Sequence, residues 1–124
     1  MKKKILLVEN EQGIIDFMEK GLKAVGYDVI YATDGASGLE LAKNKAPDLV
    51  ILDVILPDVN GFSICGFLKG NDKYRSIPLI ILTGHYDAKE QVFDDAYKPD
   101  AFFNKPFDFS QLLETIRKLI GKTK

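Results

Sequence analysis

Polar residues that could do chemistry stand directly after the apolar runs of this chain. Glu9 and Asn10 follow the first run, Asp53 the third, Thr83 the fourth and Lys105 the fifth. A carboxylate can attack a phosphoryl group and form an acyl phosphate. Carboxylate and amide oxygens also suit Mg²⁺, which keeps several waters. The residue types therefore predict a phosphoryl-accepting pocket with a hard divalent ion.

Within such a pocket each residue type has a distinct role. Clustered carboxylates raise one another's pKa unless a cation compensates, so Glu9 and Asp53 call for a metal. Asp53 is the candidate nucleophile, and Lys105 adds a point charge beside the transferring oxygens. Any one of these residues taken alone is more typical of a turn or a helix cap. It is their coincidence that favours a site.

Five apolar runs of strand length predict the strands that position these residues. Segments with helical spacing follow each of them, and Asp34, Asn60 and either Asp108 or Ser110 are placed to open helices. The predicted strands are Ile5–Val8, Val29–Ala32, Leu49–Leu52, Leu79–Leu82 and Ala101–Phe103, and the predicted helices cover 14–25, 36–42, 62–68, 92–96 and 112–120.

Alternation of strand and helix predicts an α/β fold, a parallel sheet with helices on both faces. Right-handed crossovers favour the flavodoxin-like, doubly wound strand order 2-1-3-4-5, flanked by five helices. In this order the first and third strands are neighbours, which brings Glu9, Asn10 and Asp53 together at the carboxyl edge. No linker or repeat interrupts the pattern, so residues 1–124 are expected to form one domain.

Composition narrows the partners. Seventeen basic and eighteen acidic residues give a formal charge of −1, which argues against direct binding of nucleic acid. No apolar run approaches the roughly 20 residues of a membrane-spanning helix, so we expect a cytoplasmic protein without membrane contact. Cys65 is the only cysteine and His85 the only histidine, which rules out an intrachain disulfide or a Cys/His metal site.

Over nearly its whole length the chain resembles the receiver domains of two-component response regulators. Ile5–Glu11 resembles the acidic opening motif of that family, and Asp53–Pro57 with Asn60-Gly61 resembles its phosphoacceptor segment. Ile81–Gly84 and Lys105–Phe107 resemble its switch and lysine motifs. In this order and spacing the four motifs are highly specific.

The resemblance implies a regulatory phosphoacceptor rather than an enzyme. Asp53 would take phosphate from a sensor histidine kinase or a phosphotransfer protein. Mg²⁺ would be held by Glu9, Asn10, Asp53 and the backbone carbonyl of Ile55. Lys105 would form an ion pair in the pocket.

The resemblance also implies how the signal leaves the pocket. Thr83 and Gly84 would bind the phosphoryl group, and Phe102 would report the shift of the Thr83 hydroxyl. Pro106 would follow a cis peptide bond. The fourth helix, fifth strand and fifth helix would then bind a downstream protein or a fused output domain, or form a homodimer.

Two departures from the family keep an alternative open. Relatives usually carry an acid where Asn10 stands, and Lys98-Pro99 replaces a small Gly-Ala pair. A charge pair at ~4 Å is worth about 1 kcal/mol in water and about 4 at intermediate dielectric, so the neutral Asn10 should weaken Mg²⁺ binding. The alternative is a pseudo-receiver that binds proteins independently of phosphorylation.

Two enzyme classes fit less well. A phosphatase of the dehalogenase type needs a second acid two residues after the nucleophile, where Ile55 stands. Nucleotide binding would require a glycine-rich phosphate loop after a strand, and the sequence has no G-x-G-x-x-G or Walker motif.

Overall fold

The computed structural model describes residues 2–84 and 97–121. Strands and helices alternate through its first four strands. The strands are β1 Lys4–Val8, β2 Asp28–Ala32, β3 Leu49–Leu52, β4 Leu79–Thr83 and β5 Ala101–Asn104. The helices in these ranges are α1 Gln12–Ala24, α2 Gly35–Asn44, α3 Gly61–Lys69 and α4 Phe109–Ile120.

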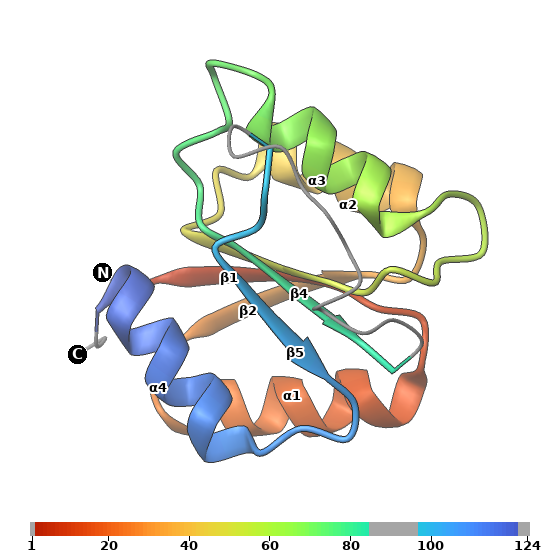
Figure 1. Cartoon of the computed structure of the whole chain (residues 1–124). Coiled ribbons are helices and arrows are strands. Elements are labelled where there is room, and N and C mark those ends of the chain that lie inside the picture. The colour runs from red at the N-terminus through yellow and green to blue at the C-terminus, as the bar shows by residue number, and fades with distance from the viewer. Residues whose placement is uncertain (1, 85–96, 122–124) are drawn as a thin grey trace.

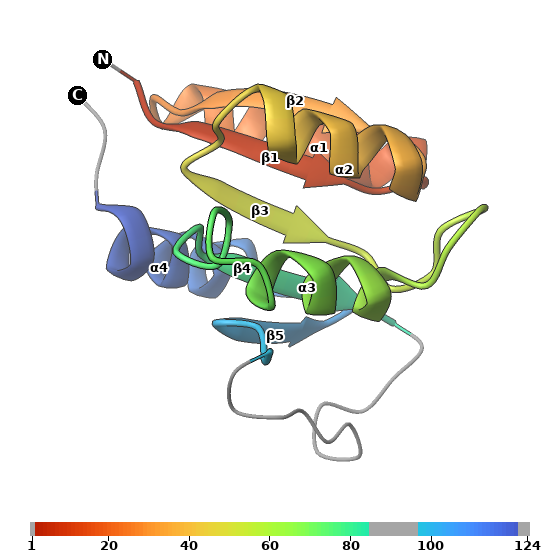
Figure 2. The ribbon, with the colours of Figure 1, turned by 90° about the horizontal axis from the view of Figure 1, so that it is seen from above.

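All five strands lie parallel in one sheet, in the order β2-β1-β3-β4-β5 (Figure 2). The predicted fold class and strand order are confirmed, and each predicted strand agrees with the observed one to within a residue at either end. Of the five predicted helices, four are present. The remaining prediction, over 92–96, lies outside the described residues.

Helices cover both faces of the sheet (Figure 1). Ile5 and Leu7 of β1 point into a core shared with α1 and α4, whereas Leu6 and Val8 point into a second core shared with α2 and α3. Strands buried on both faces read as continuous apolar runs, which is why these segments were recognisable.

Side-chain caps fix where α2, α3 and α4 begin. Asp34 accepts a hydrogen bond from Ser37 N at 2.7 Å, and Asn60 accepts one from Phe62 N at 2.8 Å. At α4 the cap is Asp108, which accepts from Gln111 N at 3.2 Å. Each cap satisfies one of the backbone donors that the first helical turn leaves unpaired.

The segment that enters β5 packs on α3. Cys65 is completely buried, and its thiol lies 3.5 Å from the carbonyl oxygen of Tyr97. A Cβ at Gly70 would come within 2.8 Å of the Tyr97 ring, so the glycine makes room for the ring. Burial raises the pKa of the Cys65 thiol to about 11. These contacts anchor the chain just before Lys98-Pro99.

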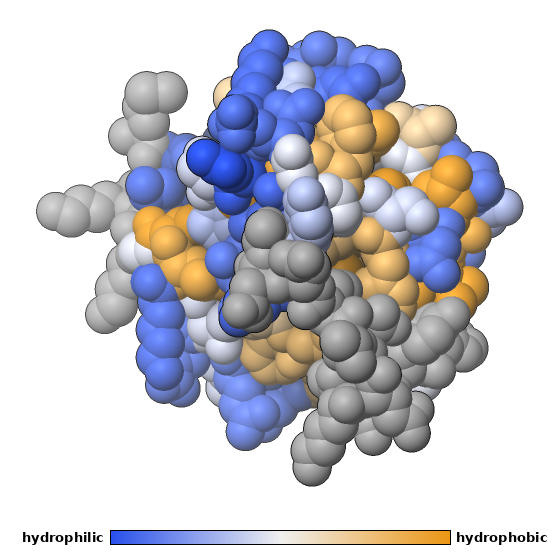
Figure 3. All heavy atoms as spheres, turned by 45° about the horizontal axis from the view of Figure 1, so that its top comes forward, coloured by the Kyte–Doolittle hydropathy of each residue, from blue (hydrophilic) through white to orange (hydrophobic). Residues whose placement is uncertain are grey.

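Hydrophobic patches interrupt the charged surface on the face where the α2–α3 layer is turned forward (Figure 3). An apolar hollow of about 280 Å³ lies there, lined by residues of α2 and α3 together with Val59. Across the described ranges, no helix is both long and apolar enough to cross a membrane.

Candidate functional site

Two buried carboxylates meet where β1 and β3 end. Asp53 N donates to the carbonyl oxygen of Val8 at 2.9 Å, and Glu9 N donates to Ala32 O at 3.0 Å. Glu9 is 1% exposed and Asp53 3%. The parallel register therefore places two acids beside each other at the carboxyl edge of the sheet, where this fold binds its ligands.

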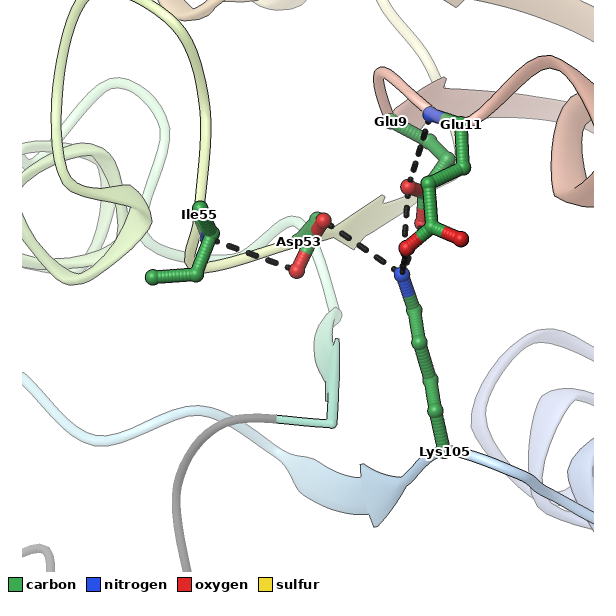
Figure 4. A network of polar contacts seen from close by, with 5 residues as sticks. All are labelled: Glu9, Glu11, Asp53, Ile55 and Lys105. Carbon is green, nitrogen blue, oxygen red and sulfur yellow. Dashed lines mark hydrogen bonds and ion pairs between the residues drawn. The ribbon is translucent and has the colours of Figure 1, made fainter.

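Lys105 reaches this pair from the end of β5. Its backbone N donates to Thr83 O at 2.9 Å, and the Lys105–Pro106 peptide bond is cis. Its ammonium donates to Glu9 Oε2 at 3.1 Å, Glu11 Oε1 at 3.0 Å and Asp53 Oδ2 at 3.4 Å (Figure 4). An ammonium has three donors. All three are directed at carboxylates.

Burial and nearby charges shift the pKa values of Glu9 and Lys105. Burial is the largest influence on the pKa of Glu9 and raises it to about 7, with the Asp53 charge acting in the same direction and the hydrogen bond from Lys105 opposing it. Burial alone would lower the pKa of Lys105, but its hydrogen bonds to Glu9 and Glu11 and the nearby negative charges outweigh that and raise it. Such perturbations are typical of functional sites.

Glu11 is the residue that sequence reasoning missed. It belongs to the opening motif but was not predicted as a site residue, and its carboxylate lies within 4.8 Å of those of Glu9 and Asp53. The backbone at Glu11 is extended, with φ −88° and ψ 112°. Side chains two residues apart in extended chain share a side, so the spacing from Glu9 was a usable signal. Asn10, between them, is exposed.

The loop after Asp53 carries Ile55. The backbone N of Ile55 lies 3.4 Å from Asp53 Oδ1 (Figure 4). Ile55 also forms an antiparallel bridge with Asn60 across the loop. Gly61 N donates to Val54 O at 2.7 Å, and a Cβ at Gly61 would overlap the Asp53 carbonyl oxygen. Close backbone approach therefore requires glycine at position 61.

Asp58 ties the same loop to α2. Its carboxylate accepts hydrogen bonds from Gly35 N at 2.7 Å and Ala36 N at 2.9 Å. These bonds hold the pKa of Asp58 below its ordinary value. The loop after Asp53 is therefore held in three places: at the end of β3, at the bridge between Ile55 and Asn60, and against α2.

The other predicted residues lie around this cluster. Thr83 is fully buried at the end of β4, and a Cβ at Gly84 would lie 3.4 Å from Lys105 Cβ, so both border the lysine. Phe102 lies within β5, three residues before Lys105, on the α3 side of the sheet, with its ring centroid 6.5 Å from that of Phe62.

The donor set suits a hard divalent ion. Glu9 Oε1 is buried and accepts no hydrogen bond from the described residues, although it lies 3.0 Å from Lys105 Nζ in an ion pair. Three carboxylates against one ammonium also leave two negative charges uncompensated if all of them are ionised. An oxygen-rich pocket with this charge is of the type that binds Mg²⁺.

Comparison with known proteins identifies the family. The response regulator receiver domain family matches residues 5–117, and the chain belongs to it. Its members are regulatory phosphoacceptors of two-component signalling rather than enzymes. The expected family and its general role are confirmed.

Individual relatives agree with this assignment. The chain is 37% identical over 122 residues to the DNA-binding dual master transcriptional regulator RpaA of Synechocystis, covering 97% of this chain and 50% of that protein. It is 39% identical over 119 residues to the response regulator ArlR of Staphylococcus saprophyticus, covering 96% and 53%. The chain therefore spans about half the length of these curated relatives.

A solved structure gives the same result for the fold. The CheY-like response regulator receiver domain protein of Methanospirillum hungatei superposes with a TM-score of 0.86 at 30% sequence identity, covering 96% of this chain and 94% of that one.

Proposed function

We propose that Asp53 accepts a phosphoryl group from the phosphohistidine of a sensor kinase or phosphotransfer protein in a Mg²⁺-dependent reaction. The observation that carries the proposal is the Asp53 carboxylate, buried at the carboxyl edge with Lys105 Nζ at 3.4 Å. In the transfer an Asp53 oxygen forms a bond to phosphorus while the P–N bond to the donor imidazole breaks. The bonding electrons leave with the imidazole nitrogen.

The metal ligands in this proposal are Glu9, Asn10, Asp53 and the Ile55 carbonyl. Bound Mg²⁺ would neutralise charge that develops on the transferring phosphoryl oxygens. Support comes from the buried Glu9 Oε1, which accepts no hydrogen bond from the described residues, and from the charge of the cluster. The loop bonds described above would hold the Ile55 backbone in place without the metal.

The remaining pocket residues would receive the phosphoryl group. Lys105, already positioned by its bond to Thr83 O at 2.9 Å, would contribute a fixed positive charge. The Thr83 hydroxyl and the backbone at Gly84 would bind phosphoryl oxygens. Phe102 would then respond to the movement of Thr83, because the two residues lie on the neighbouring strands β5 and β4.

A docking surface for the donor adjoins the pocket. A hollow of about 570 Å³ opens between the start of α1 and the segment after Lys105, and Ile14, Phe17 and Phe107 contribute apolar side chains to it. Phe17 is 55% exposed. An exposed apolar group beside a reactive carboxylate suits a partner that brings its phosphohistidine to Asp53.

The output would depend on a partner. Because the chain spans about half the length of its curated relatives and one of them is named as DNA-binding, the proposal includes either a fused output domain or a separate downstream protein, and a homodimer. The proposal includes a cytoplasmic location. It does not include direct contact between this domain and nucleic acid.

One observation favours a second function. Asn10 is neutral and exposed, at a position where the family usually supplies a metal-binding acid. A pseudo-receiver, which binds partners without taking phosphate, would tolerate that change. The two functions differ in whether Asp53 becomes modified.

The deciding experiment is intact-mass spectrometry after incubation with acetyl phosphate and Mg²⁺. Unsubstituted protein should gain one phosphoryl group and Asp53→Ala none. Asp72→Ala is the matched control, because the Asp72 side chain is 90% exposed and pairs only at the surface with Arg75. Uptake retained by Asp53→Ala, or absent from the unsubstituted protein at high Mg²⁺, would contradict the phosphoacceptor and leave the pseudo-receiver.

A further inference from the structure

Asn10 leaves the pocket without a negative charge that relatives usually carry at this position, and a neighbouring acid can supply that charge. Among the described residues, the carboxylates that could surround one ion are those of Glu9, Glu11 and Asp53, all within 4.8 Å of one another. Asn10 is exposed and contributes no charge. The acid missing at position 10 is therefore matched by an acid one residue later.

Glu11 is directed at the pocket although its position in the chain offers it another role. It is the N-cap residue of α1, yet its side chain makes no capping hydrogen bond. Its carboxylate instead lies 3.0 Å from Lys105 Nζ, and its backbone N donates to Glu9 Oε2 at 3.2 Å. Glu11 thus both contributes charge and orients the buried glutamate.

The described part of the pocket leaves Glu9 Oε1 without a hydrogen-bond donor, although this oxygen lies 3.0 Å from Lys105 Nζ in an ion pair. Lys105 uses its three N–H groups on Glu9 Oε2, Glu11 Oε1 and Asp53 Oδ2. Glu9 Oε1 accepts no hydrogen bond within the described part of the chain, and Glu9 is 1% exposed. Because the Lys105 ammonium is shared with Glu11 and Asp53, a cation bound in the pocket would complete the coordination of Glu9 Oε1.

We infer that Glu11 supplies the third negative charge of the divalent-cation site, in place of the acid that Asn10 lacks. When Glu9, Glu11 and Asp53 are all ionised, their three negative charges exceed the single positive charge of Lys105 by two, which matches a divalent ion. The inference rests on the proposed function for the identity of the ion, since Mg²⁺ is the metal that the phosphoryl transfer needs. It assigns to Glu11 an electrostatic role, exerted on the ion directly or through one of its waters.

Mg²⁺ titration calorimetry at fixed ionic strength tests this assignment. Glu11→Gln keeps the size of the side chain and removes the charge. Two unit charges ~4 Å apart attract by about 1 kcal/mol in water. Because Glu11 is half-exposed and faces a divalent ion, neutralising it should weaken Mg²⁺ binding about tenfold. Adding Asn10→Asp to Glu11→Gln should return the Kd to within about twofold of the unsubstituted value, because the lost charge is restored one residue earlier.

Glu114→Gln is the matched control. Like Glu11, Glu114 is an exposed glutamate paired with a lysine; its side chain is 70% exposed on α4, and its neutralisation should leave Mg²⁺ binding unchanged. The Mg²⁺ concentration for half-maximal labelling of Asp53 should shift with the same pattern across the variants. Thermal unfolding without metal checks that Glu11→Gln is folded.

A Kd for Glu11→Gln within about twofold of the unsubstituted protein would overturn the inference, and so would a failure of Asn10→Asp to restore binding. Neither result would touch the proposed function if Asp53 is still labelled. Conversely, Mg²⁺ binding with the expected variant pattern but no labelling would sink the proposed function and sustain the role of Glu11. No Mg²⁺ binding by the unsubstituted protein would overturn both.

Discussion

Among the residues that the structure describes, Lys69 and Lys105 have largely buried side chains, and their surroundings differ. Lys69 of α3 is 9% exposed at its side chain and forms an ion pair with Asp100 at 2.7 Å. Its ammonium also donates to the carbonyl oxygens of Ile77 at 2.9 Å and Arg75 at 3.2 Å. One positive charge therefore meets one negative charge and two neutral acceptors.

The surroundings of Lys105 are unbalanced by comparison. Its side chain is 13% exposed, and its ammonium faces Glu9, Glu11 and Asp53 at 3.0 to 3.4 Å. A buried charge that is paired and fully hydrogen-bonded is explained by structure alone. An excess of negative charge around one lysine is not explained by structure alone. Such an excess therefore distinguishes a ligand site from a structural ion pair.

Replacing Lys105 should produce the largest effect on function. Lys105→Met removes the fixed charge beside Asp53, and phosphorylation from acetyl phosphate at saturating Mg²⁺ should slow by about 10²–10³-fold. Mg²⁺ should bind at least as tightly as before, because a competing cation is gone. Intact-mass time courses and calorimetry measure the two quantities, and a rate within tenfold of the unsubstituted protein would contradict this view of Lys105.

Replacing Lys69 should affect stability instead. Lys69→Met leaves Asp100 and two carbonyl groups without their shared donor, and breaking a buried pair in this way should cost about 3 kcal/mol of unfolding free energy. Urea denaturation measures the loss. Mg²⁺ affinity of the folded protein should stay unchanged, and a change above about threefold would show that the two lysine environments are not independent.

The imbalance around Lys105 should also appear as a pH dependence. Glu9 has its pKa raised from 4.5 to about 7, so between these values the folded protein holds more protons than the unfolded chain. Without metal, this contribution to stability is therefore present below pH 4.5 and is lost as the pH rises through 7. Because Mg²⁺ needs the ionised carboxylate, its affinity should fall as the pH drops below 7, by up to about tenfold per pH unit.

Calorimetry at several pH values checks that dependence, with Glu9→Gln as the comparison. The variant should bind Mg²⁺ more weakly and with a flatter pH profile. An unsubstituted protein whose affinity is constant between pH 5.5 and pH 7.5, a window that brackets the value of about 7, would contradict the raised pKa.

A solvated lysine should show the smallest effect. Lys118 pairs with Glu114 at 3.6 Å, and the two side chains are 75% and 70% exposed. Lys118→Met should change the unfolding free energy by less than about 0.5 kcal/mol. If urea denaturation shows a larger loss of unfolding free energy, burial does not account for the different effects of replacing Lys69, Lys105 and Lys118.

Much of the fold was predictable because its signals are local. Leu49–Leu52 is a continuous apolar run because both of its faces are covered, and Asp34, Asn60 and Asp108 mark helix starts by their own side chains. The partnership of Lys69 with Asp100 was not predictable in this way. It joins residues far apart in sequence, and the spacing of α3 indicates only an apolar helix.

The site residues likewise differ in whether a local sequence signal marks them. Glu9, Asp53 and Lys105 could be grouped because each follows a strand whose neighbours the topology sets. Glu11 was missed because an exposed residue just before a helix is usually a cap, and its actual contact is with a lysine from another strand. The two-residue spacing from Glu9 indicates a shared side only where the backbone is extended, and composition and motif do not specify the torsions of Glu11.

The burial of Cys65 has a practical consequence for labelling experiments. As the sole cysteine, with a completely buried side chain and a pKa raised to about 11, it should react slowly with alkylating reagents while the domain stays folded. A cysteine introduced on the surface could then carry a spin label or fluorophore without prior removal of the native thiol. Any alkylation of Cys65 itself would report how often the packing of α3 against the segment at Tyr97 opens.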